Sequence, residues 1–321
     1  MRLNYSNRPV LLRSDAGLTV IEVLVAATIT ALIAAMLLGL AVATLAQWSR
    51  AQDRLMVENQ ARAVLDQMTQ DIESARFRDD GNVWLAATLQ AGKGASGAWV
   101  DGAKPVSASL DPMAASLADA RFGVAGVWLR LFTSRLGADP VTNDPAGPVA
   151  VAYQIIRRSP TAGGGLCHYL LYRSEVSPAA TLAAGFDLST ENYTAASDLE
   201  GAAGNIVSPR RRQVIADNVI DFGLRFYGEE TQTGSAGSEH RQLFPLGSSA
   251  LEYRATAPPN AADFAGRMPA VVEVMLRILT AEGARRIAAL EAGKTEGDWW
   301  SIAQVHSRVF TRRIVIQAGR F

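Results

Sequence analysis

The stretch "AGLTVIEVLVAAT", residues 16–28, decides the fold because it opens a long apolar run that holds a single carboxylate. Across residues 18–46 the only charged side chain is Glu22, and there is no proline. A membrane-crossing helix needs roughly 20 apolar residues, so this run can span a bilayer with a turn or two to spare. It is also longer than the apolar region of a cleaved secretory signal. A carboxylate in hydrocarbon is costly and needs a partner, so Glu22 requires an explanation.

The charges of the chain balance, with 31 basic and 31 acidic residues, so nothing suggests a nucleic-acid-binding protein or a polybasic membrane-surface protein. Three arginines, Arg2, Arg8 and Arg13, precede the apolar run against one acid, Asp15. The positive-inside rule therefore predicts a cytoplasmic N-terminus, with everything after the run on the far side of the membrane. The single cysteine, Cys167, excludes an intramolecular disulfide and a cysteine metal cluster, and it is predicted to be a small buried hydrophobe.

The helix is predicted to continue beyond the membrane. The next prolines on either side of the run are Pro9 and Pro105, and the following sequence is rich in good helix formers. Apolar residues recur at alternating steps of four and three, which makes one stripe: Ala61, Leu65, Met68, Ile72 and Ala75. The pattern predicts one helix from about residue 18 to about residue 77, on the order of 90 Å long, whose second half packs on a globular domain.

The stretch "GLTVIEVLVAATITALIAAMLLG" resembles the N-terminal signature of type IV pilins and type II secretion pseudopilins. The resemblance implies that a prepilin peptidase cuts after Gly17 on the cytoplasmic side and methylates the new N-terminus, Leu18. It also places Glu22 fifth in the mature chain, where the family carries a glutamate. Leucine is a departure from the usual phenylalanine or methionine at the first mature position.

This resemblance offers an explanation of Glu22. Subunits of such filaments pack their helices side by side in an apolar core, where an unpaired carboxylate and an unpaired terminal ammonium are both costly. An incoming N-terminus that docks on a neighbour's Glu22 relieves both charges. The alternative is that Glu22 only reaches to the cytoplasmic interface of the membrane.

The rest of the chain contains segments with strand-like alternation. In one of them, residues 218–227, Ile220, Phe222 and Leu224 face one way while Asp221 and Gly223 face the other. The other candidates are residues 122–132, 149–158, 167–175, 270–280 and 307–317. We expect a mainly antiparallel β domain with one solvated face, and mobile loops at residues 189–204 and 228–240.

The order of these segments resembles the larger minor pseudopilins of the J class and the PilW-type minor pilins. The predicted fold class is α+β, with a long N-terminal helix packed on a mainly antiparallel sheet domain. The expected organisation is a cytoplasmic leader (1–17, removed), a transmembrane and filament-core helix (18–46), its amphipathic continuation (47–78) and a periplasmic β-rich domain (79–321).

Two sequence patterns imitate nucleotide sites. Gly92, Gly94 and Gly97 fit G-x-G-x-x-G, but no helical period follows them. "GKT" at residues 293–295 lacks the first glycine of a P-loop, and Gly293 is better read as the C-cap of a preceding helix. We expect no cofactor.

Other chemistry-bearing residues do not form a recognisable site either. The three histidines, His168, His240 and His306, are scattered without zinc-ligand spacing. Asp79 and Asp80 lack the alternating spacing of a calcium loop and are predicted to end a helix in a turn. A tryptophan pair, residues 299 and 300, is predicted to pack in the core or an interface. No metal site is expected.

Two functions remain. The first is a non-enzymatic minor pilin or pseudopilin subunit in the inner membrane, which helps to initiate or cap a type II secretion pseudopilus or type IV pilus. Its partners would be the prepilin peptidase, other minor and major subunits and the inner-membrane assembly platform. The second is a signal-anchored envelope enzyme or binding protein. Gly17 and Glu22 favour the first, because a plain anchor needs neither.

Overall fold

The computed structural model describes residues 19–90, 110–135, 137, 146–161, 165–195, 201–231, 238–247, 251–317 and 319–320. The chain divides into two compact units, residues 1–52 and residues 53–321. The described part of the first unit is helical. The second contains antiparallel β-sheets, so the α+β class is confirmed.

Helix α1 (Val20–Glu73) is 54 residues long, and its N-terminal part is long and apolar enough to cross a membrane. Its large apolar side chains in the first unit are exposed. Thr28, Thr30 and Thr44 donate their hydroxyls to backbone carbonyls three or four residues earlier, at 2.7–2.8 Å. These polar groups are therefore satisfied within the helix, as a lipid environment requires.

The helix ends before the predicted residue 77. It stops at Glu73, where the Ser74 hydroxyl donates to the carbonyl of Gln70 at 2.6 Å. The chain then forms strand β1 (Arg76–Phe77), which pairs in parallel with β12 (Gly319–Arg320). Pairing with a segment from the far end of the chain overrides the local helical preference.

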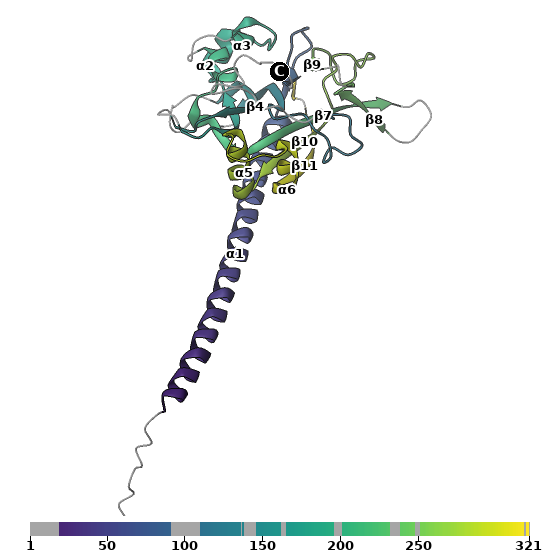
Figure 1. Ribbon diagram of the computed structural model, residues 1–321. Helices are drawn as coiled ribbons and strands as arrows, with labels where there is room; N and C mark the ends of the chain where they lie inside the picture. The colour runs from purple at the N-terminus through teal and green to yellow at the C-terminus, as the bar shows by residue number, and fades with distance from the viewer. Residues whose placement is uncertain are drawn as a thin grey trace, which may run out of the picture. The chain divides into compact units, whose positions relative to one another are not determined.

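The second unit holds two antiparallel sheets (Figure 1). The six-stranded sheet has the order β6 (Val214–Asp217), β5 (His168–Glu175), β4 (Gly147–Arg158), β3 (Val127–Arg135), β2 (Leu85–Leu89) and β9 (Glu252–Ala255). The four-stranded sheet has the order β11 (Ser307–Val315), β10 (Val271–Leu279), β7 (Val219–Thr231) and β8 (Ser238–Phe244). The chain passes from one sheet to the other between β6 and β7, through Asn218 with a φ of 57°. Asparagine tolerates this left-handed conformation better than most residues do.

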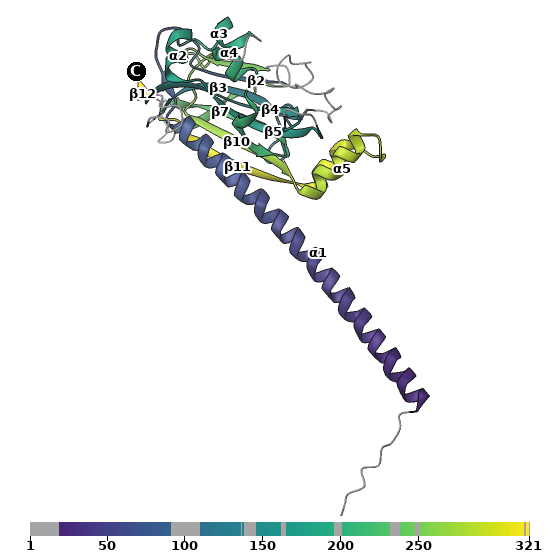
Figure 2. The same cartoon turned by 90° about the vertical axis from the view of Figure 1, so that its left-hand side faces the viewer.

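The C-terminal turns of α1 belong to the second unit and touch the edge strands of both sheets. The predicted stripe is confirmed, since Ala61, Leu65, Met68, Ile72 and Ala75 are all buried. The Gln60 amide donates to Asp217 of β6, at 3.1 Å to the carbonyl oxygen and 2.7 Å to Oδ1. On the other side, Arg312 of β11 pairs with Asp66 at 2.5 Å, and Figure 2 shows β11 beside these turns.

The prediction of one solvated face is wrong for the central strands. In β4, every residue of 149–156 is buried, because α2 (Pro178–Ala184) and α4 (Ala202–Ile206) contact this strand. In β7, Asp221 and Arg225 are buried although they alternate with the core residues. Residues 110–126 cover that face, so the strand predicted at residues 122–132 begins only at Val127.

Parts of the two segments predicted to be mobile loops carry regular structure, and residues 196–200 and 232–237 of these segments lie outside the described residues. Residues 189–204 include α3 (Glu191–Thr194) and the start of α4, and Tyr193 is buried with its hydroxyl donating to the Gly185 carbonyl at 2.7 Å. In residues 228–240, β7 runs on to Thr231 and β8 begins at Ser238. Polar composition did not distinguish these elements from loops.

A helical pair follows β10. Helix α5 (Ala281–Glu291) has Ala292 as its C-cap residue, and Gly293 follows directly with a φ of 68° and donates to the Leu290 carbonyl. The predicted glycine at the end of this helix is therefore confirmed, one position beyond the cap. Helix α6 (Trp299–His306) buries Trp299 and Trp300, whose rings stack 6.0 Å apart, which confirms the predicted packing role. The short helix η1 (Arg211–Gln213) precedes β6.

Candidate functional site

The start of α1 is the first candidate site. Gly17 and Leu18 lie outside the described residues. Glu22 lies in the first turn, where its Oε2 accepts the Thr19 N–H at 2.9 Å and the Thr19 hydroxyl at 3.0 Å. The Glu22 N–H donates back to the Thr19 hydroxyl at 3.3 Å. This reciprocal arrangement is a capping box, which satisfies N–H groups that a helix start otherwise leaves without partners.

The capping box gives Glu22 a role within its own chain. The carboxylate has local hydrogen-bond donors, and it sits at the helix N-terminus, where the helix dipole favours negative charge. Both capping bonds end on Oε2, and within the described residues Oε1 accepts no hydrogen bond. The sequence carries the signal for this box, a threonine three residues before the glutamate.

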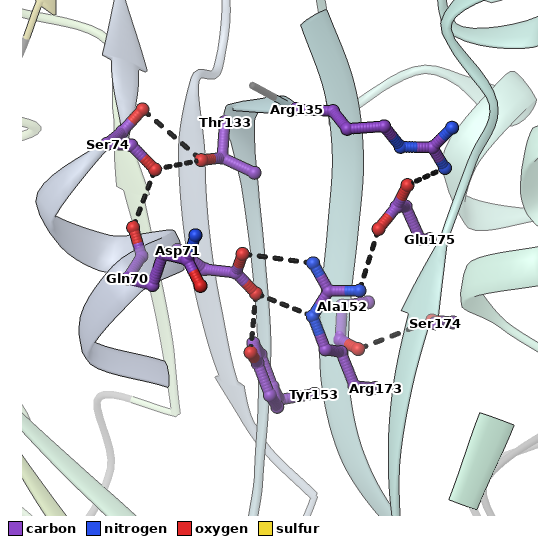
Figure 3. Close-up of polar contacts among 10 residues, drawn as sticks. All are labelled: Gln70, Asp71, Ser74, Thr133, Arg135, Ala152, Tyr153, Arg173, Ser174 and Glu175. Carbon is purple, nitrogen blue, oxygen red and sulfur yellow. Dashed lines mark hydrogen bonds and ion pairs between the residues drawn. The ribbon is translucent and has the colours of Figure 1, made fainter. Parts of the chain in front are cut away.

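The second candidate site is a polar anchor inside the second unit, defined here as Asp71, Tyr153, Arg173, Glu175 and Arg135 (Figure 3). Asp71 projects from α1 and is buried. Its Oδ2 accepts the Tyr153 hydroxyl at 2.5 Å and Arg173 Nε at 2.7 Å, while its Oδ1 accepts Arg173 Nη2 at 3.0 Å. The carboxylate is thus held by a two-pronged guanidinium and a phenol from two adjacent strands of the six-stranded sheet.

The anchor continues across the sheet with alternating charges. Arg173 also donates Nη1 to Glu175 Oε2 at 2.7 Å, and Glu175 Oε1 accepts Arg135. Directly after the end of α1, the Ser74 hydroxyl lies 2.7 Å from the Thr133 hydroxyl (Figure 3). Each buried charge therefore faces a partner of opposite sign, which is the condition for tolerating buried ions.

The pKa values of both Tyr153 and Arg173 are raised in the anchor. Burial, followed by the negative charge of Asp71, raises the pKa of Tyr153 well above its usual value. Burial acts to lower the pKa of Arg173, but the hydrogen bonds and charge of Asp71 outweigh it and raise that pKa. Tyr153 stays neutral and Arg173 stays charged, so the anchor is a fixed structural contact rather than a proton-transfer site.

Sequence reasoning did not find this anchor. Asp71 follows Val57 and Val64 at steps of seven, and all three are buried on the sheet-facing side of α1. A carboxylate on a buried helical face predicts a buried cationic partner. The partner itself could not be named, because Arg173 lies 102 residues away in the chain.

A cavity of about 230 Å³ lies beside α5 and the start of β5, with mainly apolar walls. Its carboxylate, Glu291, accepts Arg157 Nη2 at 2.7 Å, Trp299 Nε1 at 3.0 Å and the Tyr169 hydroxyl. Burial, followed by the charge of Glu291, raises the pKa of Tyr169. Glu291 therefore holds α5 and α6 against the sheet. Cys167 also lines this cavity. It is half-buried, whereas the sequence predicted a buried residue.

The remaining predicted site residues do not converge within the described part of the chain. No group of three or more His, Cys, Asp and Glu side chains is placed to hold a metal there. His168 begins β5, His240 lies on β8 and His306 ends α6. The turn at Asp80 follows β1 rather than the helix. Its Oδ1 accepts the Asn82 N–H at 3.0 Å and the Trp84 indole at 2.9 Å. The glycines at residues 92, 94 and 97 lie outside the described residues.

These features define an α+β protein with one N-terminal helix that fits a single-pass membrane anchor. No protein-family model and no curated protein matches the chain.

Proposed function

We propose that this chain is a minor subunit of a pilin-like filament, of the type II secretion pseudopilus or type IV pilus kind, and that it helps to initiate or cap assembly. The observation that carries the proposal is Glu22 five positions after Gly17, in the first turn of a long apolar helix that continues into a β domain. A simple membrane anchor has no need of this spacing. In the sequence, the order of the strand segments after this helix resembles that of the J-class pseudopilins and PilW-type minor pilins.

Glu22 has two tasks in this proposal. Within its own chain, it caps α1 through Thr19. Between chains, Oε1 receives the terminal ammonium of the next subunit. The pairing neutralises two charges in an apolar bundle, and breaking a buried pair of this kind costs about 3–5 kcal/mol.

The polar anchor supports the same function. A filament subunit carries its globular domain on its helix, so the rotation of the helix against the sheet has to be fixed. The apolar stripe alone permits sliding, since dispersion contacts have little directional preference. The two-pronged contact of Arg173 with Asp71 specifies one rotation and one height.

The proposal sets the location and the partners. The chain lies in the inner membrane with a cytoplasmic N-terminus and a periplasmic β domain. The prepilin peptidase removes residues 1–17, and the mature chain meets other minor and major subunits on the inner-membrane assembly platform.

The test is the intact mass of the full chain extracted from membranes of cells that carry a prepilin peptidase. We expect loss of the first 17 residues and gain of one methyl group. Gly17→Leu places a bulky side chain beside the scissile bond and should leave the leader attached, whereas the control Leu12→Val should be processed normally. Retention of the leader in the unaltered chain refutes the proposal.

A further inference from the structure

Residues 110–126 form a strap over the second face of β7 and β10, the face that does not carry Phe222 and Leu224. The strap closes on itself, since the Asp111 and Arg121 backbones exchange hydrogen bonds at 3.0 and 2.9 Å. Gly126 at its end accepts the Gln90 N–H at 3.0 Å.

The strap is fitted closely to the sheet. The Phe122 ring lies directly on Gly223, where an added Cβ would be 2.2 Å from the ring carbons. Arginines from both strands reach its carbonyls: Arg225 donates to Ala114 and, at 3.3 Å, to Pro112, while Arg277 donates to Ala118 at 3.3 Å. Met275, the cross-strand neighbour of Gly223, is fully buried.

The Asp221 carboxyl lies at the centre of this contact and is completely buried. Its two oxygens accept the Phe122 N–H at 3.2 and 3.3 Å, so this side chain binds the backbone of the strap directly. Within the described residues Asp221 makes no ion pair shorter than 4 Å. A buried carboxyl without a close cation is held more favourably in its neutral form.

The charged groups around Asp221 come from each packed element. Arg277 is its cross-strand neighbour on β10, and Arg121 and Asp119 belong to the strap. Trp300 of α6 lies close to both arginines, with guanidinium carbons 5.7 Å (Arg121) and 5.2 Å (Arg277) from its ring centroid. The arginines and the backbone N–H groups of Phe122 and Phe222 favour the ionised carboxylate, and burial, which is the largest influence, opposes it.

We propose that the Asp221 carboxyl is a latch that holds the strap on the sheet while it is protonated and releases the strap when it ionises. Burial is the largest influence and raises the pKa of Asp221 from 3.8 to about 7 in the closed state. An open strap exposes the carboxyl to water, where its pKa returns to an ordinary value. Opening uncovers the strip of sheet at Gly223 and Met275. This inference does not depend on the proposed function.

The sign of the pH effect follows from linkage. The closed state binds the proton more tightly than the open state does. The resulting stabilisation of the closed state is therefore complete below about pH 4 and is lost as pH rises to about 7. The opening equilibrium should grow about tenfold per pH unit over this range and level off above it, a total change on the order of a thousandfold.

The test is hydrogen exchange of the full chain in detergent micelles between pH 5 and 8, with each rate corrected for the intrinsic pH dependence of exchange. The Phe122 amide should lose protection by about tenfold per pH unit up to pH 7, while amides in the centre of β3 should not change. Asp221→Asn keeps an acceptor and a neutral group, so its Phe122 protection should be independent of pH. The matched control Asp119→Asn alters a neighbouring exposed acid and should keep the pH dependence.

Two results overturn the latch. One is a Phe122 protection factor in the unaltered chain that does not change between pH 5 and 7. The other is a pH dependence in Asp221→Asn equal to that of the unaltered chain. If Asp221→Asn does not fold, the profile of the unaltered chain decides alone.

Discussion

Replacing Asp71 by alanine tests whether the polar anchor stabilises the junction of α1 and the sheet. The substitution removes three hydrogen bonds, one from the Tyr153 hydroxyl and two from Arg173. It leaves the phenol of a fully buried tyrosine without its acceptor, and a guanidinium in a largely buried position.

The expected cost follows from what remains after the substitution. Breaking a buried ion pair by deleting one partner costs about 3–5 kcal/mol. Arg173 keeps its contact with Glu175 at 2.7 Å, so the guanidinium is not left without a counter-charge. We therefore expect a loss near the low end, about 3 kcal/mol. Asp71→Asn retains an acceptor for Tyr153 and should lose less.

The assay is urea unfolding of residues 53–321, the second compact unit, followed by circular dichroism. Asp66→Ala is the matched control, because Asp66 is on the same helix and also pairs with an arginine of the sheet, but its side chain is 62% exposed. An exposed pair contributes about 0.2–1 kcal/mol, so the control should unfold near the midpoint of the unaltered protein.

Equal losses for Asp71→Ala and Asp66→Ala would refute the reasoning. That result would mean that the cost of burying Asp71 and Arg173 cancels their attraction. The helix would then be held by its apolar stripe alone.

The remaining predictions concern the helix and the strap. Glu22→Ala should leave membrane insertion and processing intact but reduce crosslinking to neighbouring subunits, and Glu22→Gln should be milder because it keeps an acceptor. If crosslinks and filament numbers are normal in Glu22→Ala, the role of Glu22 is limited to capping its own helix. A chain that begins at residue 80 lacks the buried stripe and should unfold at lower urea than residues 53–321, since each large side chain lost removes ~1.5–3 kcal/mol. Gly223→Ala should destabilise the domain and expose the strap to protease, because the added methyl overlaps the Phe122 ring. Gly137→Ala, in the same unit, meets nothing within 4 Å and is the silent comparison.

Local sequence patterns were sufficient to predict those helices and strands that have one clear periodicity. The apolar run and the 3.6-residue stripe predicted α1 and its buried face, and alternation predicted the strands that became β4, β5, β7, β10 and β11. Gly293 was identified because helix ends have a local chemical signature. The short strands β1, β6 and β9 carry too few residues to establish a period.

The sequence by itself determined the apolar helix with Glu22 in its first turn, the amphipathic continuation and the antiparallel character of the β segments. Each of these depends on neighbours a few residues apart. Only the tertiary structure decided where α1 ends, which second faces of the strands are buried, and which partners Asp71 and Asp221 have. Those outcomes depend on contacts between residues about a hundred positions apart, as between Asp71 and Arg173 or between Asp221 and Phe122. Loop closure brings such residues together at an entropic cost that grows only slowly with loop length, so many distant pairings cost about the same. Local sequence patterns therefore do not specify which pair will meet.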